Sequence, residues 1–256
     1  MIYVRFEIQG KIKHGILSGK FISEINASYL KPYKKTGKKF ALSNVKLLAP
    51  VEPGKIVALG LNYVDHAKEL KMALPLNPLI FMKPSTSVVG PGDEINYPPS
   101  SKRVDYEAEM AIVIGKKCRN VSVKQAKDYI LGYTCLNDVT ARDLQSADGQ
   151  WTRAKSFDTF CPLGPVIVSG IDADNLKIES FLNGKLKQRS NTDNLIFKVE
   201  NIVSFVSEVM TLLPGDVIAT GTPPGIGPMA KGDKVTVKIE KIGILENTVG
   251  DVSSKW

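Results

Sequence analysis

Residues 103–115 read Arg-Val-Asp-Tyr-Glu-Ala-Glu-Met-Ala-Ile-Val-Ile-Gly, and their alternation is typical of a β-strand. Successive side chains of a strand point to opposite faces, so Asp105, Glu107 and Glu109 share one face, which continues with alanine and valine. The other face is apolar from Tyr106 to Ile114. The segment therefore predicts a buried strand whose acidic end emerges into a cleft.

Two glutamates on one face of a buried strand create an electrostatic problem. Burial of an unpaired carboxylate costs several kcal/mol, so the pair must take up a proton or a cation. A divalent metal ion bound by Glu107 and Glu109 would remove the repulsion. The alternative is a solvated edge strand, on which both carboxylates face water and need no ion.

A third acidic residue follows a second expected strand. The apolar run over residues 129–134 predicts that strand, and Asp138 would lie at its end. Glu107, Glu109 and Asp138 have no paired histidine or cysteine nearby, so the set favours a hard ion such as Mg²⁺ or Mn²⁺ over zinc. Ca²⁺, which also prefers oxygen ligands, is a further choice.

The overall composition is that of a globular protein. The chain has 256 residues, with a hydrophobic fraction of 43% and a charged fraction of 23%. Its first residues, Met-Ile-Tyr-Val-Arg-Phe-Glu, favour a strand over a signal peptide, and no apolar run is long enough to span a bilayer. Three widely spaced cysteines favour reduced thiols. We therefore expect a cytoplasmic protein that binds no membrane.

The net charge is +8, and five lysines cluster within residues 31–39. Few aromatic residues lie among these lysines and no nucleic-acid-binding motif is recognisable, so we expect no nucleic-acid partner. A solvated face, or a field that attracts anionic substrates, explains the cluster more simply. A non-catalytic basic binding protein is the distant alternative.

Turn signals divide the chain into two expected units. Short β-like runs over residues 2–8, 14–17 and 21–25 predict a small β-rich N-terminal domain, which with a proline-containing linker covers residues 1–52. Residues 53–256 would form the catalytic domain. Its later elements include a hairpin around Asn183-Gly184, a helix over residues 201–211 and two closing strands. The expected fold class is mostly β, with some helix (α+β).

A candidate catalytic pair lies where residues 61–72 change to a helical period, with Asp65 as the expected N-cap. His66 and Glu69 stand at i and i+3, adjacent on one helix face. A carboxylate beside a histidine fixes its tautomer and stabilises its protonated form, as a general base that activates water requires. The alternative is an ordinary pair on a solvated helix.

Two lysines have open roles. Lys83, at the end of an expected strand, points either into the cleft or to water, and Lys155 is either a counter-ion of the carboxylates or a cation that stabilises developing negative charge. Residues 141–145 between them predict a polar turn. The Gly/Pro-rich loop around Thr222 exposes N–H and hydroxyl groups that could bind a carboxylate.

From about residue 45 to its end, the chain resembles the fumarylacetoacetate hydrolase family. The resemblance rests on five segments, Gly-Leu-Asn-Tyr-Val-Asp-His (60–66), Asp-Tyr-Glu-Ala-Glu (105–109), Asp-Val-Thr-Ala-Arg-Asp (138–143), Ala-Lys-Ser-Phe (154–157) and Pro-Gly-Asp-Val-Ile-Ala-Thr-Gly-Thr-Pro (214–223). It implies a mixed β-roll or sandwich of that family's C-terminal domain, a small β-rich N-terminal domain and a homodimer.

The resemblance also implies roles for individual residues. Glu107, Glu109 and Asp138 would bind the metal, His66 and Glu69 would form a catalytic dyad on a lid helix, and Arg142, Gln145, Lys155 and Thr222 would hold the oxygens of a 2-oxo acid. Fumarylacetoacetase has a fourth acidic ligand where this chain has Leu59, so the chain is similar to the smaller three-ligand members. Many of those members have arginine where this chain has Leu61.

The activity implied is Mg²⁺- or Mn²⁺-dependent hydrolysis of a C–C bond in an acylpyruvate. His66, assisted by Glu69, would deprotonate the water that attacks the distal carbonyl, and Lys155 and the metal would stabilise the departing pyruvate enolate. The alternative is a lyase or isomerase of the same family, acting as an oxaloacetate decarboxylase or a 2-hydroxyhepta-2,4-diene-1,7-dioate isomerase.

Overall fold

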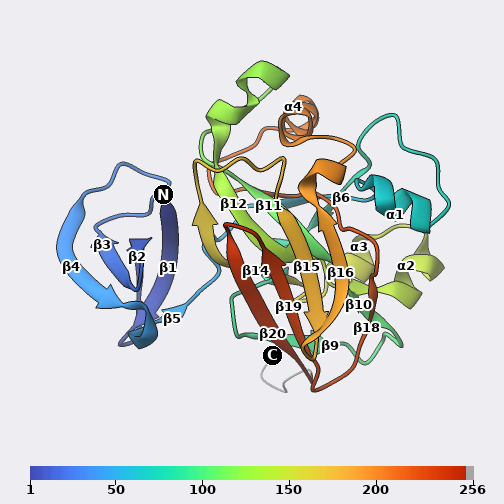
Figure 1. The fold of residues 1–256 in the computed structure, drawn as a ribbon, viewed down its shortest axis with the longest axis horizontal. Coiled ribbons are helices and arrows are strands. Elements are labelled where there is room, and N and C mark those ends of the chain that lie inside the picture. Colours follow the sequence, from blue (N-terminus) through green and yellow to red (C-terminus); the bar gives the residue numbers. More distant parts are fainter. Residues whose placement is uncertain (252–256) are drawn as a thin grey trace.

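The computed structural model describes residues 1–251 and shows a mostly β protein built from three sheets and short helices (Figure 1). The largest sheet has the order β4-β3-β2-β1-β14-β12-β11-β17-β6-β7, with β5 beside β1 and β8 beside β14. Its strands are β1 (Ile2–Ile8), β2 (Lys11–Ser18), β3 (Phe21–Ile25), β4 (Lys35–Ala41), β5 (Lys46–Leu47), β6 (Ile56–Leu59), β7 (Ile80–Lys83), β8 (Val88–Val89), β11 (Ala108–Ile114), β12 (Ile130–Asn137), β14 (Cys161–Val168) and β17 (Val217–Ala219).

The remaining elements cover this sheet and extend one end of it. One smaller sheet has the order β16-β15-β19-β20-β9 and the other β13-β10-β18. Their strands are β9 (Glu94–Tyr97), β10 (Val104–Tyr106), β13 (Thr140–Ala141), β15 (Lys177–Leu182), β16 (Lys185–Asn191), β18 (Gly227–Met229), β19 (Lys234–Ile239) and β20 (Gly243–Asp251). The helices are α1 (Val64–Glu69), α2 (Arg142–Asp148), α3 (Thr152–Lys155) and α4 (Val199–Val209), and the 3₁₀ turns are η1 (Leu42–Asn44), η2 (Ser85–Ser87), η3 (Val123–Tyr129) and η4 (Thr192–Asn194). Over residues 1–251, none of the helices combines the length and the apolar character that a membrane crossing requires.

The N-terminal strands form an antiparallel meander at one end of the molecule (Figure 1). The meander is hydrogen-bonded into the main sheet, because Ile2 of β1 pairs with Val168 of β14. The basic segment of residues 35–41, which had no predicted element, forms the outer strand β4. The domain boundary between residues 52 and 53 stays a prediction.

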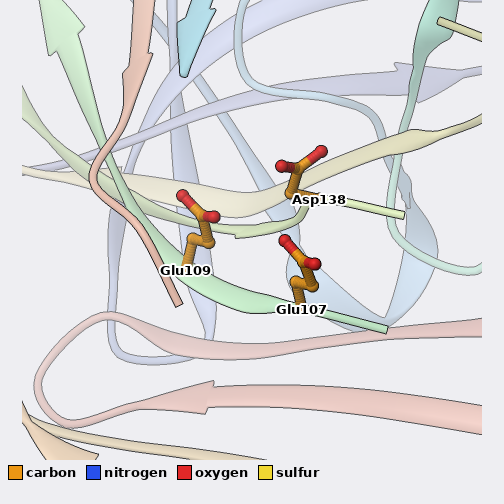
Figure 2. A group of neighbouring side chains, drawn as sticks. All are labelled: Glu107, Glu109 and Asp138. Atoms are coloured by element: carbon orange, nitrogen blue, oxygen red, sulfur yellow. The ribbon is translucent and has the colours of Figure 1, made fainter. Parts of the chain in front are cut away.

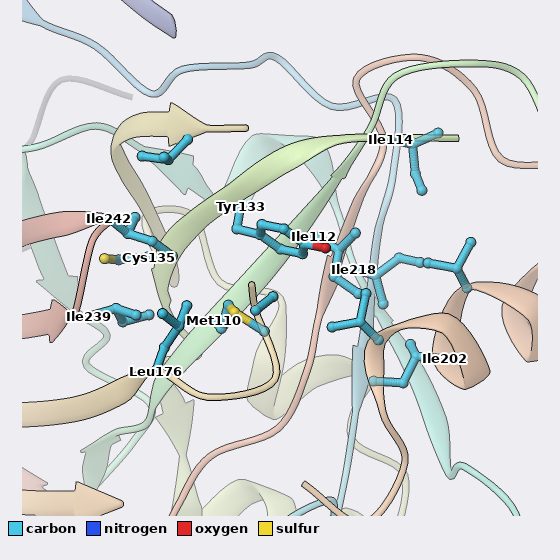
Figure 3. Packing of buried hydrophobic residues seen from close by; sticks show 14 of the residues in the cluster. Met110, Ile112, Ile114, Tyr133, Cys135, Leu176, Ile202, Ile218, Ile239 and Ile242 are labelled. Carbon is cyan, nitrogen blue, oxygen red and sulfur yellow. The ribbon is translucent and has the colours of Figure 1, made fainter. Parts of the chain in front are cut away.

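Strand β11 lies at the centre of the core and confirms the alternation seen in the sequence. Met110, Ile112 and Ile114 pack on one face, in a cluster that includes Ile202 of α4 and Ile239 of β19 (Figure 3). The side chains between them, Ala111 and Val113, pack on the other face with β6, β14 and β17. The solvated edge strand considered as an alternative is therefore wrong.

Three local predictions need correction. The segment carrying the carboxylates is two strands, because the chain leaves the main sheet at Glu107 and β10 pairs with β13 and β18 instead. The expected polar turn at residues 141–145 is the helix α2, whose one buried residue, Leu144, is too little for a helical apolar pattern. Tyr63, not Asp65, occupies the N-cap position of α1, and Asp65 accepts from the backbone of His66 inside the first turn.

Candidate active site

Three carboxylates meet where β10 and β12 end and β11 begins. Ala108 pairs with Asn137 in the β11–β12 ladder, and the Asp138 N–H donates to the Glu107 carbonyl at 2.9 Å. This register brings one oxygen from each of Glu107, Glu109 and Asp138 within 4.8 Å of one another (Figure 2). All three side chains are buried, at 6%, 1% and 0% exposure respectively.

Cationic side chains surround two of these carboxylates. Lys155 Nζ donates to Glu107 at 2.9 Å and to Asp138 at 2.6 Å, and Arg142 Nη2 also donates to Glu107. Lys83 Nζ lies 2.6 Å from the other oxygen of Asp138 and is itself 1% exposed, so it points into the protein. Burial opposes ionisation of Glu107, but Lys155 and Arg142 outweigh it and hold the pKa of Glu107 at about 2.

Glu109 has the opposite environment. Burial raises its pKa well above the ordinary value, and the charges of Asp138 and Glu107 raise it further. Its Oε2 accepts from the Gly221 N–H at 2.7 Å, and among the described residues no cationic side chain forms an ion pair with it.

The donor set fits a hard divalent ion. The available ligands are three carboxylates, all oxygen donors, and Glu109 is a buried carboxylate with no ion-pair partner among residues 1–251. A Mg²⁺ or Mn²⁺ ion held by Glu107, Glu109 and Asp138 would supply a counter-charge.

The raised pKa of Glu109 predicts a pH dependence in the metal-free protein. In the folded protein Glu109 keeps its proton, whereas in the unfolded chain it loses that proton near the ordinary glutamate pKa of 4.5. As the pH rises above 4.5, Glu109 therefore makes the folded state progressively less stable. Glu109→Gln should therefore stabilise the metal-free protein at neutral pH, by about 1–3 kcal/mol. The measurement is urea unfolding in EDTA between about pH 5 and pH 8, where the difference between variant and wild type should grow with pH.

Glu107 does not confuse this comparison, because its lowered pKa changes stability only between the ordinary value of 4.5 and about 2. A difference between Glu109→Gln and wild type that stays constant with pH would contradict the prediction.

The predicted dyad forms on α1. His66 Nδ1 lies 2.8 Å from Glu69 Oε2, and the other oxygen of Glu69 accepts from the Gly225 N–H at 3.1 Å. The His66 side chain is 6% exposed and that of Glu69 is 42% exposed. Since Nδ1 faces the carboxylate, Nε2 is the nitrogen left to accept a proton from a molecule in the cleft.

A cleft of about 320 Å³ is lined by His66 of the dyad and by Glu107 of the carboxylate cluster. Its polar lining includes His66, Glu107, Arg142, Gln145, Lys155 and Thr222. Thr222 is fixed in place, because its hydroxyl donates to the Ala108 carbonyl at 2.9 Å and accepts from Gln188 at 2.8 Å. The apolar lining includes Leu61, Phe81 and Trp151.

The structure thus brings the predicted site residues together. Glu69 lies behind His66, while Glu109 and Asp138 complete the carboxylate cluster beside Glu107. Their catalytic and binding roles stay predictions. The sequence left the direction of the Lys83 side chain undecided and indicated no role for Arg103 or Asp105. In the structure Lys83 contacts Asp138, and Arg103 and Asp105 line the cleft. A charged residue at the end of an apolar strand was the one signal for Lys83.

Comparison with known proteins gives the family. Residues 55–250 match the family described as "Fumarylacetoacetate (FAA) hydrolase C-terminal", and residues 1–50 match "Rv2993c-like, N-terminal". The chain belongs to the fumarylacetoacetate hydrolase family and is an enzyme, which confirms the resemblance and the mostly β fold class. A non-catalytic basic binding protein is therefore wrong.

Three relatives differ in the reaction that their names give. The oxaloacetate tautomerase Fahd2a, mitochondrial, of Rattus norvegicus is 47% identical over 219 residues, which are 81% of this chain and 70% of the relative. A 5-carboxymethyl-2-hydroxymuconate delta-isomerase from Mycobacterium smegmatis is 42% identical with a TM-score of 0.93, covering 98% of this chain and 100% of the other. A maleylpyruvate hydrolase from Sphingobium sp. SYK-6, solved with manganese(II) and pyruvate, is 32% identical with a TM-score of 0.83, covering 98% and 99%.

Proposed function

We propose that this enzyme interconverts the keto and enol forms of a small 2-oxo acid of the oxaloacetate type, with Mg²⁺ or Mn²⁺ bound by Glu107, Glu109 and Asp138. The observation that carries the proposal is that His66, paired with Glu69, lines the same cleft as Glu107, which belongs to a cluster of three buried carboxylates. The 47% identity to an oxaloacetate tautomerase supports this reaction over the others.

Different residues of the chain have different roles in the proposed proton transfer. When bound, the metal ion would act as a Lewis acid that polarises the 2-oxo group of the substrate. His66 Nε2 removes a proton from the carbon next to that group, and Glu69 stabilises the imidazolium that results. The 2-oxygen gains a proton in exchange, so the keto form becomes the enol. Lys155 donates to Glu107 and Asp138, helps to keep the pKa of Glu107 low, and supplies positive charge near the developing enolate.

Hydrolysis of an acylpyruvate is the second candidate. The same His66 would deprotonate a water molecule in place of the substrate carbon, and the C–C bond would then break to release pyruvate as its enolate. The maleylpyruvate hydrolase solved with manganese(II) and pyruvate favours this candidate. Decarboxylation of oxaloacetate and isomerisation of a hydroxylated dienedioate need the same enolate and stay alternatives.

The test follows the ultraviolet absorbance of the enol form of oxaloacetate, and separately the loss of acetylpyruvate. Equilibration of oxaloacetate should be accelerated with Mg²⁺ and not with EDTA, and Glu107→Ala and His66→Ala should each remove the acceleration. Metal-dependent loss of acetylpyruvate without acceleration of oxaloacetate equilibration would assign the hydrolase reaction instead. Activity that survives EDTA would contradict both candidates. The homodimer and the cytoplasmic location stay predictions.

A further inference from the structure

Two guanidinium groups lie side by side at the rim of the cleft, both held by Asp105. Arg103 donates from Nε to Asp105 Oδ1 at 2.9 Å and from Nη2 to Oδ2 at 3.2 Å. Arg142 donates from Nε to the same Oδ2 at 3.0 Å. Asp105 is fully buried, whereas the Arg103 side chain is 51% exposed and lines the cleft. The buried carboxylate therefore fixes the direction of an exposed guanidinium.

The two arginines differ in the donors that they have left. Arg142 uses all three of its nitrogens, on Asp105, Glu107 and Gln145. Arg103 uses two, and no acceptor among the described residues receives a hydrogen bond from its Nη1. A guanidinium has five N–H donors in a planar fork that suits a carboxylate, so Arg103 retains the free end of that fork.

The charges around the cleft single out the same residue. Lys155 and Lys83 form ion pairs with Glu107 and Asp138, and Arg142 forms ion pairs with both Glu107 and Asp105. Asp105 thus faces two guanidiniums with one negative charge. The apolar part of the lining, which includes Leu61, Phe81 and Trp151, offers little to an anion beyond one indole N–H.

We propose that Arg103 determines specificity for 2-oxo dicarboxylic acids by binding the carboxylate farthest from the 2-oxo group. The inference rests on the proposed function, in which the 2-oxo end of the substrate lies at Glu107, Glu109 and Asp138. Asp105, which holds Arg103, is two residues from Glu107 along an extended segment. Two residues of a strand span roughly 7 Å, and this distance suits the length of a four- or five-carbon diacid.

The test compares two ligands of equal chain length, 2-oxoglutarate and 2-oxopentanoate, which differ only in the distal carboxylate. Calorimetric titration of the Mg²⁺-loaded protein gives a dissociation constant for each without any need for turnover. Wild type should bind 2-oxoglutarate more tightly, and Arg103→Gln should weaken that binding about tenfold to one-hundredfold while binding of 2-oxopentanoate changes less than about twofold.

Arg153→Gln is the matched control. Arg153 is also half exposed and is held through Nε and Nη2 by one aspartate, Asp148, but it lies outside this cleft. This variant should keep the preference for 2-oxoglutarate. A preference that survives in Arg103→Gln, an equal loss for both ligands, or no preference or no binding in wild type would overturn the inference.

Failure of the reaction is separable from failure of this inference. An Arg103-dependent preference in a protein that leaves oxaloacetate and acetylpyruvate unchanged would refute the proposed reaction alone. Turnover of oxaloacetate without such a preference would refute the role of Arg103 alone.

Discussion

Replacing Asp138 by asparagine is expected to lower metal-dependent turnover by at least about a thousandfold and also to destabilise the protein. The amide would remove one of the three proposed metal ligands, and it would leave the buried ammonium groups of Lys83 and Lys155 without the carboxylate that each contacts at 2.6 Å. Breaking a buried ion pair from one side costs about 3–5 kcal/mol. Steady-state kinetics with Mg²⁺ and urea unfolding in EDTA measure the two effects separately.

Glu109→Gln is the control for the Asp138→Asn variant. It removes a proposed ligand from the same cluster and should also lower turnover. It should nevertheless stabilise the metal-free protein at neutral pH, because Glu109 has no ion-pair partner among the described side chains. Opposite signs of the stability change would therefore separate the electrostatic roles of two neighbouring carboxylates. If Asp138→Asn were as stable as wild type, the ion pairs with the two lysines would have no energetic importance.

Replacing His66 by alanine is expected to lower kcat about one-hundredfold to ten-thousandfold, the usual contribution of a general base. Affinity for Mn²⁺ should change less than about twofold, because the carboxylates that would bind the ion belong to other elements. Kinetics on oxaloacetate and a titration of Mn²⁺ binding provide both measurements.

Replacing Glu69, the partner of His66, should lower kcat less than replacing His66 itself. Glu69 is 42% exposed, so water partly replaces its carboxylate, and Glu69→Gln should lower kcat only about tenfold. A loss of Mn²⁺ binding in His66→Ala would contradict its assignment as a base and would point to a structural role at the carboxylate cluster.

The sequence was informative where a local pattern determines the structure. The alternation in residues 108–114 predicts which side chains share each face of β11. Successive side chains of any strand point to opposite faces, so this prediction needs no knowledge of where the strand lies. Asn183-Gly184 predicts the β15–β16 turn, and both residues have the positive φ that this turn requires, 51° and 75°. Asp138 follows its strand as expected.

The sequence was less informative where the structure depends on distant partners. The chain leaves the main sheet at Glu107 because β10 pairs with β18, which lies about 120 residues further along the chain. The alternation of polar and apolar residues continues through this point and gives no sign of the change. Asp105 is buried against Arg142, which is 37 positions along the chain. The side of the strand to which Lys83 points depends on Asp138, 55 positions away. Local patterns contain no information on such contacts.

The N-terminal meander of β1 to β4 has two edges, which are protected in different ways. On the outer edge, β4 carries Lys35, Lys38 and Lys39 with exposed side chains, and lysines along an edge oppose pairing with another chain. This gives the basic cluster a structural purpose. On the inner edge, β5 pairs with β1 at Phe6 and Glu7, and β14 pairs with it at Ile2 and Tyr3. Beside β14, the amino group of Met1 donates to the Ser169 carbonyl.

This difference matters during synthesis. Ser169 is 168 positions from Met1, so β1 to β4 leave the ribosome well before β14 exists. The part of the inner edge that pairs with β14 stays open until residues 161–169 have been made. During this interval the outer edge of the nascent sheet is protected by its own lysines, whereas the part of β1 that pairs with β14 still has unpaired backbone groups.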